Sequence, residues 1–540
     1  MKKLTCLLLA AGLLFGAVTE ATAVDFKAKG EWIIMFDYGQ NGALSGGNGN
    51  TGFNNLRNLK HNSYGQDEFE ATQRLRLQLD AIASENLSGT VFFEIGQQRW
   101  GKADEGGALG ADGTMVKLKN AYLDWIVPST DLKIRMGISN MSLPSYTMHV
   151  SQIFAADSAG VTATWAANEN ISVTAFWARL LNDNLDADNA ALLYNGKKKA
   201  DYLDNIDLFA LSVPMTFDGI KITPFFAYSM LGPNAIRMYQ REENGRYFNV
   251  VHTIYPNDHR NFPKDDSKDI LTGMFPIGGA RHENGTRAGE WLRGYGNAWW
   301  AGFASDFTLW DPWHIAVDFN YGSVTWDNRR LNRSGWVASG LVEYKLDWGV
   351  PGIYGWYASG DDGDASNGSE RMPYLANSDH DNDFASYAFA KDMSRASGQI
   401  GQGVTGTWGL GLRLKDVSFL EDLKHTLRLV YIGGTNSPKM GRKVRNFYGM
   451  RADGSPSAPQ NRSHFWVGMD GEYLTTLDSA MEASLSTTYK IYDNLTVSFD
   501  AAYVPLWLDS SVWKNVQRNG TNGCDVRDMW NLNVAFIYSF

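Results

Sequence analysis

The sequence predicts an all-β fold, a transmembrane antiparallel β-barrel of about 16–18 strands with short periplasmic turns and long extracellular loops. Three observations lead to this prediction. Apolar and polar residues alternate with period two, short turns alternate with long connections, and the last ten residues form an alternating strand that ends in an aromatic residue. The 540 residues include 55 Gly, 15 Pro and 13% aromatic side chains, a composition typical of a large β protein.

The predicted strands each have one apolar and one polar face. In the segment 74–81, Leu75, Leu77 and Leu79 alternate with Arg74, Arg76 and Gln78. Counting such segments predicts 18 strands, with 16 as the alternative. The predicted starts are near residues 24, 68, 88, 114, 132, 159, 171, 204, 220, 296, 314, 335, 352, 403, 424, 478, 495 and 529.

The connections differ in length in a regular way. Tight turns are predicted near 85–88, 128–131, 169–172, 217–219, 311–312, 349–352 and 493–496. Between them lie long segments rich in Gly, Asn and Asp, at 39–66, 99–113, 140–158, 181–203, 231–295, 361–402, 435–475 and 507–527. Short turns on one rim and long loops on the other are typical of an outer-membrane barrel, and an even number of strands places both termini on the short-turn side.

Aromatic residues cluster beside the short turns. We predict that they form a girdle at one membrane interface, where amphipathic rings settle at the level of the lipid headgroups. The predicted girdle consists of Trp125, Trp165, Trp310, Trp313 and Trp348.

The last strand has an apolar face that alternates up to the final aromatic residue. Its members are Leu532, Val534, Phe536, Tyr538 and Phe540. This pattern predicts a lipid-facing strand. It also resembles the C-terminal assembly signal of bacterial outer-membrane barrels, which implies the barrel-assembly machinery as a partner.

The N-terminus has the three parts of a secretory signal peptide. Lys2 and Lys3 are followed by an apolar stretch at 4–18 and by the small-residue cleavage site 21–23. We therefore predict a signal peptide at 1–23, cleavage near Ala23, and a single barrel over 24–540. Bacterial outer-membrane lipid is the expected environment.

Several other classes of function find no support in the sequence. A formal net charge of −10 argues against nucleic acid as a partner. No cofactor and no metal site are predicted, because there is no dinucleotide fingerprint, H-E-x-x-H motif or Cys pair in a metal spacing. The acidic stretch 361–370 misses the register of a calcium loop, so an acidic surface loop is favoured there.

Two stretches are similar to trimeric bacterial porins. The segment 117–125, followed by a turn and 132–137, resembles the fourth and fifth strands of general porins. The start of the mature chain, 24–32, resembles the homotrimeric porins of sulfate-reducing bacteria. The resemblance implies a homotrimer and a loop at 140–158 that folds into the pore as a constriction. That loop has Asp157 as its one acid, fewer than general porins place there, so their cation selectivity is not carried over.

If the apolar strand positions face lipid, the intervening positions line the lumen. The candidate pore-lining residues are Arg74, Arg76, Glu94, Lys117, Lys119, Lys133, Arg135, Asp157, Arg413, Lys415 and Arg428. Lys117 and Lys119 share the lumen with Asp124 only if the strand contains a bulge near Asn120. We hypothesise that Arg74, Arg76 and Arg135 form a basic wall facing the inward loop and give a mild preference for small anions. The alternative is a wall whose charges pair internally and give no preference.

The predicted function is a porin, a water-filled channel for passive diffusion of small hydrophilic solutes and ions. No catalytic residue is predicted. The alternative is a channel of the same class that selects an oxyanion or a sugar. A barrel enzyme and a surface adhesin are further alternatives, with Ser463 and His464 as the one adjacent Ser–His pair.

Overall fold

The structure of the chain is a computed structural model. It describes residues 24–40, 68–102, 107–110, 116–182, 205–232, 237–243, 246–251, 273–274, 276, 295–327, 329–364, 366–377, 383–389, 393–394, 400, 403–447, 467–468, 471–513, 517–518, 525–526 and 528–540. The predicted signal peptide at 1–23 and the pair Ser463 and His464 lie outside these residues. Within the described residues, no helix is both long and apolar enough to cross a membrane.

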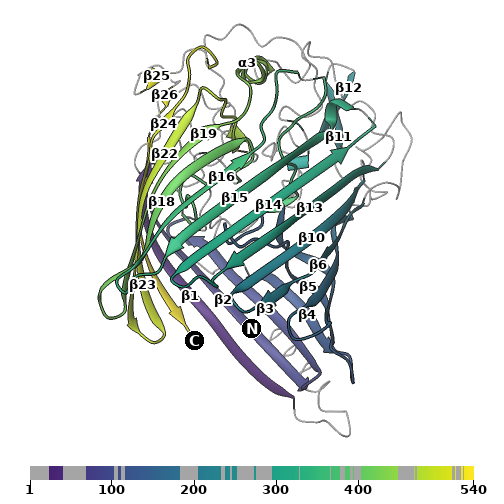
Figure 1. The fold of residues 1–540 in the computed structure, drawn as a ribbon, viewed down its shortest axis with the longest axis vertical. Coiled ribbons are helices and arrows are strands. Elements are labelled where there is room, and N and C mark those ends of the chain that lie inside the picture. The colour runs from purple at the N-terminus through teal and green to yellow at the C-terminus, as the bar shows by residue number, and fades with distance from the viewer. Residues whose placement is uncertain are drawn as a thin grey trace.

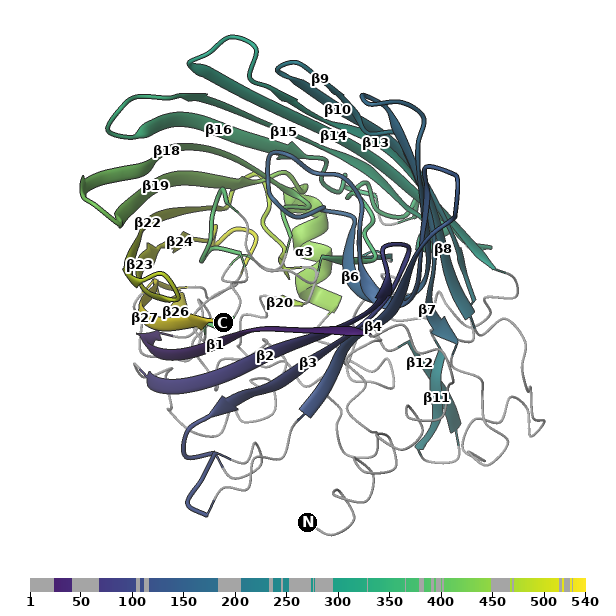
Figure 2. The same cartoon turned by 90° about the horizontal axis from the view of Figure 1, so that it is seen from below.

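An antiparallel sheet closes on itself to form a barrel (Figures 1 and 2). Its strands are, in order, β1 (Asp25–Gln40), β2 (Glu68–Ser84), β3 (Leu87–Arg99), β4 (Val116–Ile126), β5 (Leu132–Ser142), β6 (Phe154–Ala166), β7 (Ser172–Asn182), β8 (Asn205–Ser212), β10 (Ile220–Leu231), β13 (Gly296–Phe307), β14 (Trp313–Thr325), β15 (Arg333–Tyr344), β16 (Val350–Ala358), β18 (Thr407–Leu420), β19 (Leu423–Gly434), β22 (Ser479–Tyr492), β23 (Leu495–Val504) and β27 (Met529–Ser539).

The barrel has 18 strands among the described residues, which settles the choice between 16 and 18. The sheet contains 21 strands, of which three do not add to the ring. β9 (Met215–Phe217) continues β8 beyond Pro214, and β24 (Leu506–Trp507) continues β23 beyond Pro505, because proline lacks the N–H that a ladder needs. The third, β17 (Ala376–Asn377), pairs with β6 in parallel.

The remaining short elements lie in the long connections. They are β11 (Arg237–Glu243), β12 (Arg246–Val251), η5 (Arg329–Leu331), α3 (Pro438–Phe447), β20 (Val467–Gly468), β21 (Gly471–Glu472), β25 (Gln517–Arg518) and β26 (Asp525–Val526). α3 sits over the loop-side opening of the barrel, as both ribbon views show (Figures 1 and 2).

The first and last strands close the ring. β1 pairs with β27 from Glu31 opposite Ser539 to Gln40 opposite Trp530. At the end of this seam the amide N–H of Gly30 donates to the carbonyl oxygen of Phe540 at 2.8 Å. Gly30 leaves room for the Phe540 ring, because a Cβ at that position would collide with it. Closure leaves the sheet with no exposed edge.

The strand starts agree closely with the sequence prediction. Most lie within three residues of the predicted positions, since the period-two pattern is a local property of each strand. The largest differences are at β6, which begins at Phe154 and not near 159, and at β18, which begins at Thr407 and not near 403.

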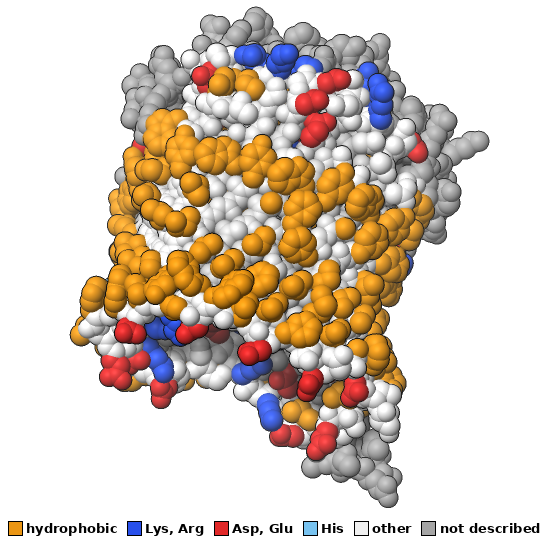
Figure 3. Space-filling view, viewed as in Figure 1, with side chains coloured by type: hydrophobic (Ala, Val, Ile, Leu, Met, Phe, Trp, Pro, Cys, Tyr) orange, Lys and Arg blue, Asp and Glu red, His pale blue; other side chains and the backbone are white. Residues whose placement is uncertain are grey.

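A belt of apolar side chains crosses the face of the barrel that Figure 3 shows. Charged side chains appear above and below this belt, and few interrupt it. The five predicted girdle tryptophans lie beside the short turns and are 38% to 53% exposed. Leu532, Phe536 and Tyr538 of β27 are also exposed, as is Phe540, which follows the strand. Because so much apolar surface would be unfavourable in water, the outer face is that of a membrane-spanning barrel.

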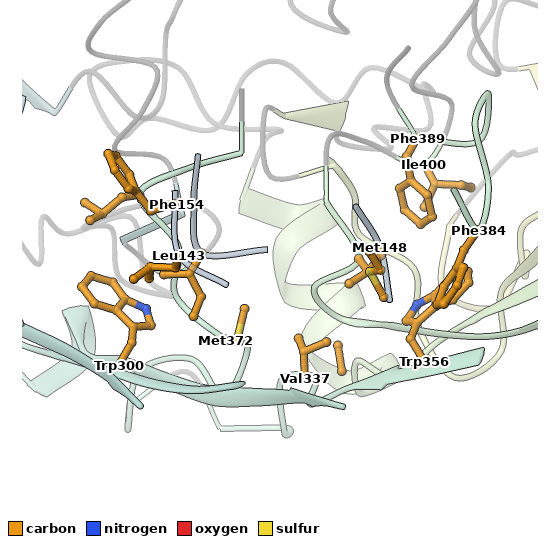
Figure 4. Packing of buried hydrophobic residues seen from close by; sticks show 14 of the residues in the cluster. Leu143, Met148, Phe154, Trp300, Val337, Trp356, Met372, Phe384, Phe389 and Ile400 are labelled. Carbon is orange, nitrogen blue, oxygen red and sulfur yellow. The ribbon is translucent and has the colours of Figure 1, made fainter. Parts of the chain in front are cut away.

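The main apolar core lies inside the barrel and not between two sheets. Trp300, Val337 and Trp356 point inward from β13, β15 and β16 and are buried. They pack against buried residues of two connections, among them Met148 and Phe384 (Figure 4). The lumen is therefore partly filled by the chain itself.

Candidate solute pathway

The connection between β5 and β6 crosses the lumen and binds the opposite wall. We call residues 143–153 the short inner segment. Its Ser145 and Thr147 hydroxyls donate to the Asp318 carboxylate of β14 at 2.9 and 2.7 Å, and the N–H groups of Tyr146 and Thr147 donate at 3.0 Å each. Four donors on one buried carboxylate fix the segment in place.

Two further hydrogen bonds hold the short inner segment to neighbouring strands. The Tyr146 hydroxyl lies 2.8 Å from Thr223 of β10, and the Thr147 hydroxyl lies 2.6 Å from Ser339 of β15. In the order of the ring, β14 and β15 lie opposite β2 and β3. The predicted basic wall on β2 therefore faces the strands to which the segment is attached.

The boundaries predicted for this loop were too wide. Residues 140–142 belong to β5 and residues 154–158 belong to β6. Asp157 is consequently a residue of β6 and not the acid of a constriction loop. Its carboxylate accepts hydrogen bonds from Lys119 Nζ at 2.6 Å and Asn120 Nδ2 at 2.9 Å. The short inner segment itself contains no acidic residue.

A second connection, between β16 and β18, also enters the barrel. We call the described parts of 369–406 the long inner segment. Tyr354 of β16 donates to the carbonyl oxygen of Phe384 at 2.5 Å, and Glu482 of β22 accepts the N–H groups of Tyr387 and Ala388 at 3.0 and 2.6 Å. Met393 packs against the inner face of β1 and β27. These contacts reach widely separated strands, so the long inner segment spans the lumen.

Buried arginines hold the start of the long inner segment. Arg333 of β15 is fully buried and donates to the carbonyl oxygens of Arg371 and Met372 at 3.2 and 2.9 Å. Arg371, also fully buried, donates to the carbonyl oxygen of Thr405 at 2.9 Å. Each guanidinium therefore satisfies backbone acceptors of the long inner segment that would otherwise be unpaired.

The predicted charges of β2–β5 lie on the lumen side and are mostly paired. Arg76 donates to Glu94 at 2.9 Å, and Glu94 also faces Lys117 in the register. Arg135 and Asp124 form another ion pair, in which the guanidinium donates to both carboxylate oxygens at 2.7 Å.

Two other basic residues complete this part of the wall. Lys133 lies 3.1 Å from Asp124, and Arg74 is 5% exposed. This arrangement agrees with a wall whose charges pair internally more than with an uncompensated basic wall.

The bulge that the sequence requires in β4 is present. The register between β3 and β4 shifts between Phe92 and Phe93, so that Lys119 and Asn120 together oppose one residue. The bulge places Lys117 and Asn120 on the lumen side of β4 together with Asp124. Leu118 and Leu123 are exposed on the outer face.

A second basic group lies on β18 and β19, on another part of the wall. Arg413 is 3% exposed and donates to Glu343 of β15 at 2.7 Å, and Lys415 follows it on the same face. Arg413 and Arg428 also contact the Asp383 carboxylate of the long inner segment, at 3.5 and 3.8 Å. Two arginines of the wall thus hold one carboxylate that the long inner segment inserts between them.

The acidic stretch 361–370 is not simply a surface loop. Asp361 is 5% exposed and accepts hydrogen bonds from the Tyr473 hydroxyl at 2.6 Å and the Glu370 N–H at 3.1 Å. Burial, together with the Asp361 charge, raises the pKa of Tyr473 well above its ordinary value, so Tyr473 stays a proton donor. Among the described residues, no group of three or more His, Cys, Asp or Glu could hold a metal ion.

Sequence reasoning missed how the two inner segments attach. Asp318, Glu343 and Glu482 are recognisable as lumen-facing acids from the strand alternation. That Asp318 and Glu482 receive backbone N–H groups from residues about 172 and 95 positions away is not encoded in any local pattern. Asp383 lies within a long connection, and nothing in its neighbourhood marks it as a partner of two arginines.

Comparisons with known proteins found similar chains among solved structures alone. No family model matches the chain, and no curated protein matches it. Similar solved structures include OccK11 (OpdR) of Pseudomonas aeruginosa, 11% identical over 95% of this chain and 96% of that chain, with a TM-score of 0.46. OccAB3 of Acinetobacter baumannii is 10% identical over 95% and 99%, with a TM-score of 0.47. OpdK of Pseudomonas aeruginosa, solved with vanillate, is 8% identical over 95% and 98%, with a TM-score of 0.45.

Proposed function

We propose that this chain is a channel of the bacterial outer membrane through which small hydrophilic solutes and ions diffuse. The observation that supports it most directly is that the outer face of the wall is apolar and its inner face is charged. Apolar side chains such as Leu410 and Leu412 of β18 face outward, and Arg413, the residue after Leu412, faces the lumen. A membrane-spanning barrel with a charged interior offers polar solutes a path that the bilayer does not.

The two inner segments would determine which solutes pass. The short inner segment binds β10, β14 and β15, and the long inner segment binds β16, β19 and β22. The path between them is narrower than the bare barrel. We expect a low conductance and a small exclusion size for the native protein.

A second candidate is a channel that selects anionic solutes. It is favoured by the contact of Arg413 and Arg428 with Asp383, because a site that accepts a carboxylate of the chain has the chemistry to accept a free carboxylate or oxyanion. Saturable transport of an anion would support this candidate, and transport that rises linearly with concentration would support passive diffusion.

Three further properties belong to this proposal. The chain reaches the outer membrane after cleavage near Ala23, the barrel-assembly machinery recognises the final strand, and the assembled protein is a homotrimer. Cross-linking of the folded protein in native membranes tests the last of these. A cross-linked trimer is expected, and a protein that stays monomeric under saturating cross-linking would exclude it.

The decisive experiment is conductance of the detergent-folded protein in a planar bilayer under a KCl gradient. We expect stepwise openings, grouped in threes if the protein is a trimer. A control uses the same preparation after heat denaturation, which should give no steps. A correctly folded barrel that opens no channel at any voltage would overturn the proposed function.

A further inference from the structure

One side chain of the short inner segment is left facing solvent. Residues 143 and 147–153 are buried with a single exception, and residues 144–146 are partly buried. The exception is His149, the only exposed residue of the segment. Because the segment lies inside the barrel, the exposed imidazole faces the solvent-filled part of the lumen.

The backbone at His149 is unusual. Its φ angle is 65°, in the left-handed region that non-glycine residues seldom adopt. Such conformations are strained and persist where the surrounding contacts impose them. Here Thr147 is fixed on Asp318, and Met148 is packed in the core of the lumen. The backbone before His149 is therefore held in place, while the imidazole itself remains exposed.

His149 is also the segment's only histidine, the residue type whose charge proteins most often switch between about pH 5 and pH 8. In the described part of the chain no acid pairs with it. A proton gained by His149 would therefore add a positive charge to the lumen where the segment crosses it.

Most of the charged groups on the elements packed against the segment already have partners. On β14, Asp318 accepts four donors of the segment, and His314 lies between Asp306 and Glu343. On β15, Glu343 also binds Arg413. The charged groups that face the lumen from β10, β19 and the long inner segment are Lys221, Arg428 and Asp383, of which the last two contact each other.

We propose that His149 makes the ion selectivity of this channel depend on pH, a proposal that rests on the proposed channel function. The imidazolium form favours anions over cations at the crossing of the short inner segment, and the neutral imidazole does not. His149 thus acts as a specificity-determining residue. His314 is a second imidazole on the lumen side, so replacing His149 alone separates its contribution from that of His314.

The test measures reversal potentials of single channels in a KCl gradient at pH 7.5 and pH 5.0. The native protein should show a rise of about two- to fivefold in the chloride-to-potassium permeability ratio on acidification, as expected for one charge partly screened by water and salt. His149→Asn should abolish the rise, because asparagine accepts a positive φ without carrying a charge. His149→Lys should show the high ratio at both pH values.

The matched control is His425→Gln. His425 lies on β19, where its ring is 2.9 Å from the Thr487 hydroxyl, away from the short inner segment. This variant should keep the native pH dependence. If His149→Asn channels respond to pH as the native channels do, or if His149→Lys channels give the native ratio at pH 7.5, the inference is wrong. A folded protein that opens no channel overturns the proposed function and this inference with it.

Discussion

Replacing Asp318 by Asn should release the short inner segment from the wall. In the native protein the carboxylate accepts four donors, from Ser145, Tyr146 and Thr147. A hydrogen bond to a charged group contributes about 1.5–3 kcal/mol and one to a neutral group about 1 kcal/mol. An amide also presents two N–H groups, one of which would face the segment's donors. The combined loss is about 3 kcal/mol, roughly a hundredfold in the equilibrium between bound and released segment.

The expected result of Asp318→Asn is a larger or more variable single-channel conductance and passage of larger sugars in liposome-swelling assays. The matched control is Asp80→Asn, because Asp80 is a lumen-facing carboxylate of β2 whose bonds go to Thr90 and Gln78 of the wall. This control should leave conductance and exclusion size unchanged. The reasoning would be refuted by a folded Asp318→Asn protein, together with a folded Asp318→Ala protein, that both keep the native conductance and exclusion size.

Two further changes test the wall and the seam. Asp383→Asn should remove the negative charge that balances the guanidinium of Arg428. The chloride-to-potassium permeability ratio, measured from reversal potentials, should then rise about two- to fivefold. An unchanged ratio would show that this carboxylate does not balance the arginine. Gly30→Ala should weaken closure of the barrel, because the new methyl group collides with the Phe540 ring, and the folded form should become less resistant to heat on gels. Gly340→Ala is its control, since the nearest atom to a Cβ there is 3.8 Å away; equal heat resistance of the two variants would contradict the role assigned to Gly30.

The barrel wall could be predicted because its information is local. In 74–81 the alternation of leucine with charged or polar residues assigns both the strand and its two faces, and the tertiary structure keeps that assignment. The bulge near Asn120 was predictable for the same reason, since the alternation changes phase there. The lumen-facing positions of Arg76, Arg135 and Arg413 also follow from parity along a strand.

The interior of the barrel depended on contacts that no local pattern records. The residues that attach the short inner segment lie about 172 positions from Asp318, and their own sequence is neutral and unpatterned. The sequence predicts Asp157 in the loop because β6 begins with five residues, 154–158, that lack the alternation of its later part.

The sequence by itself therefore determined a closed barrel, its apolar exterior and the sign of each wall charge. Only the tertiary structure decided that two connections enter the lumen, that most wall charges are paired, and that His149 is left facing solvent. The physical reason is that a strand's two faces are set by neighbouring residues. The path of a long connection is set by hydrogen bonds and packing between residues far apart in the chain.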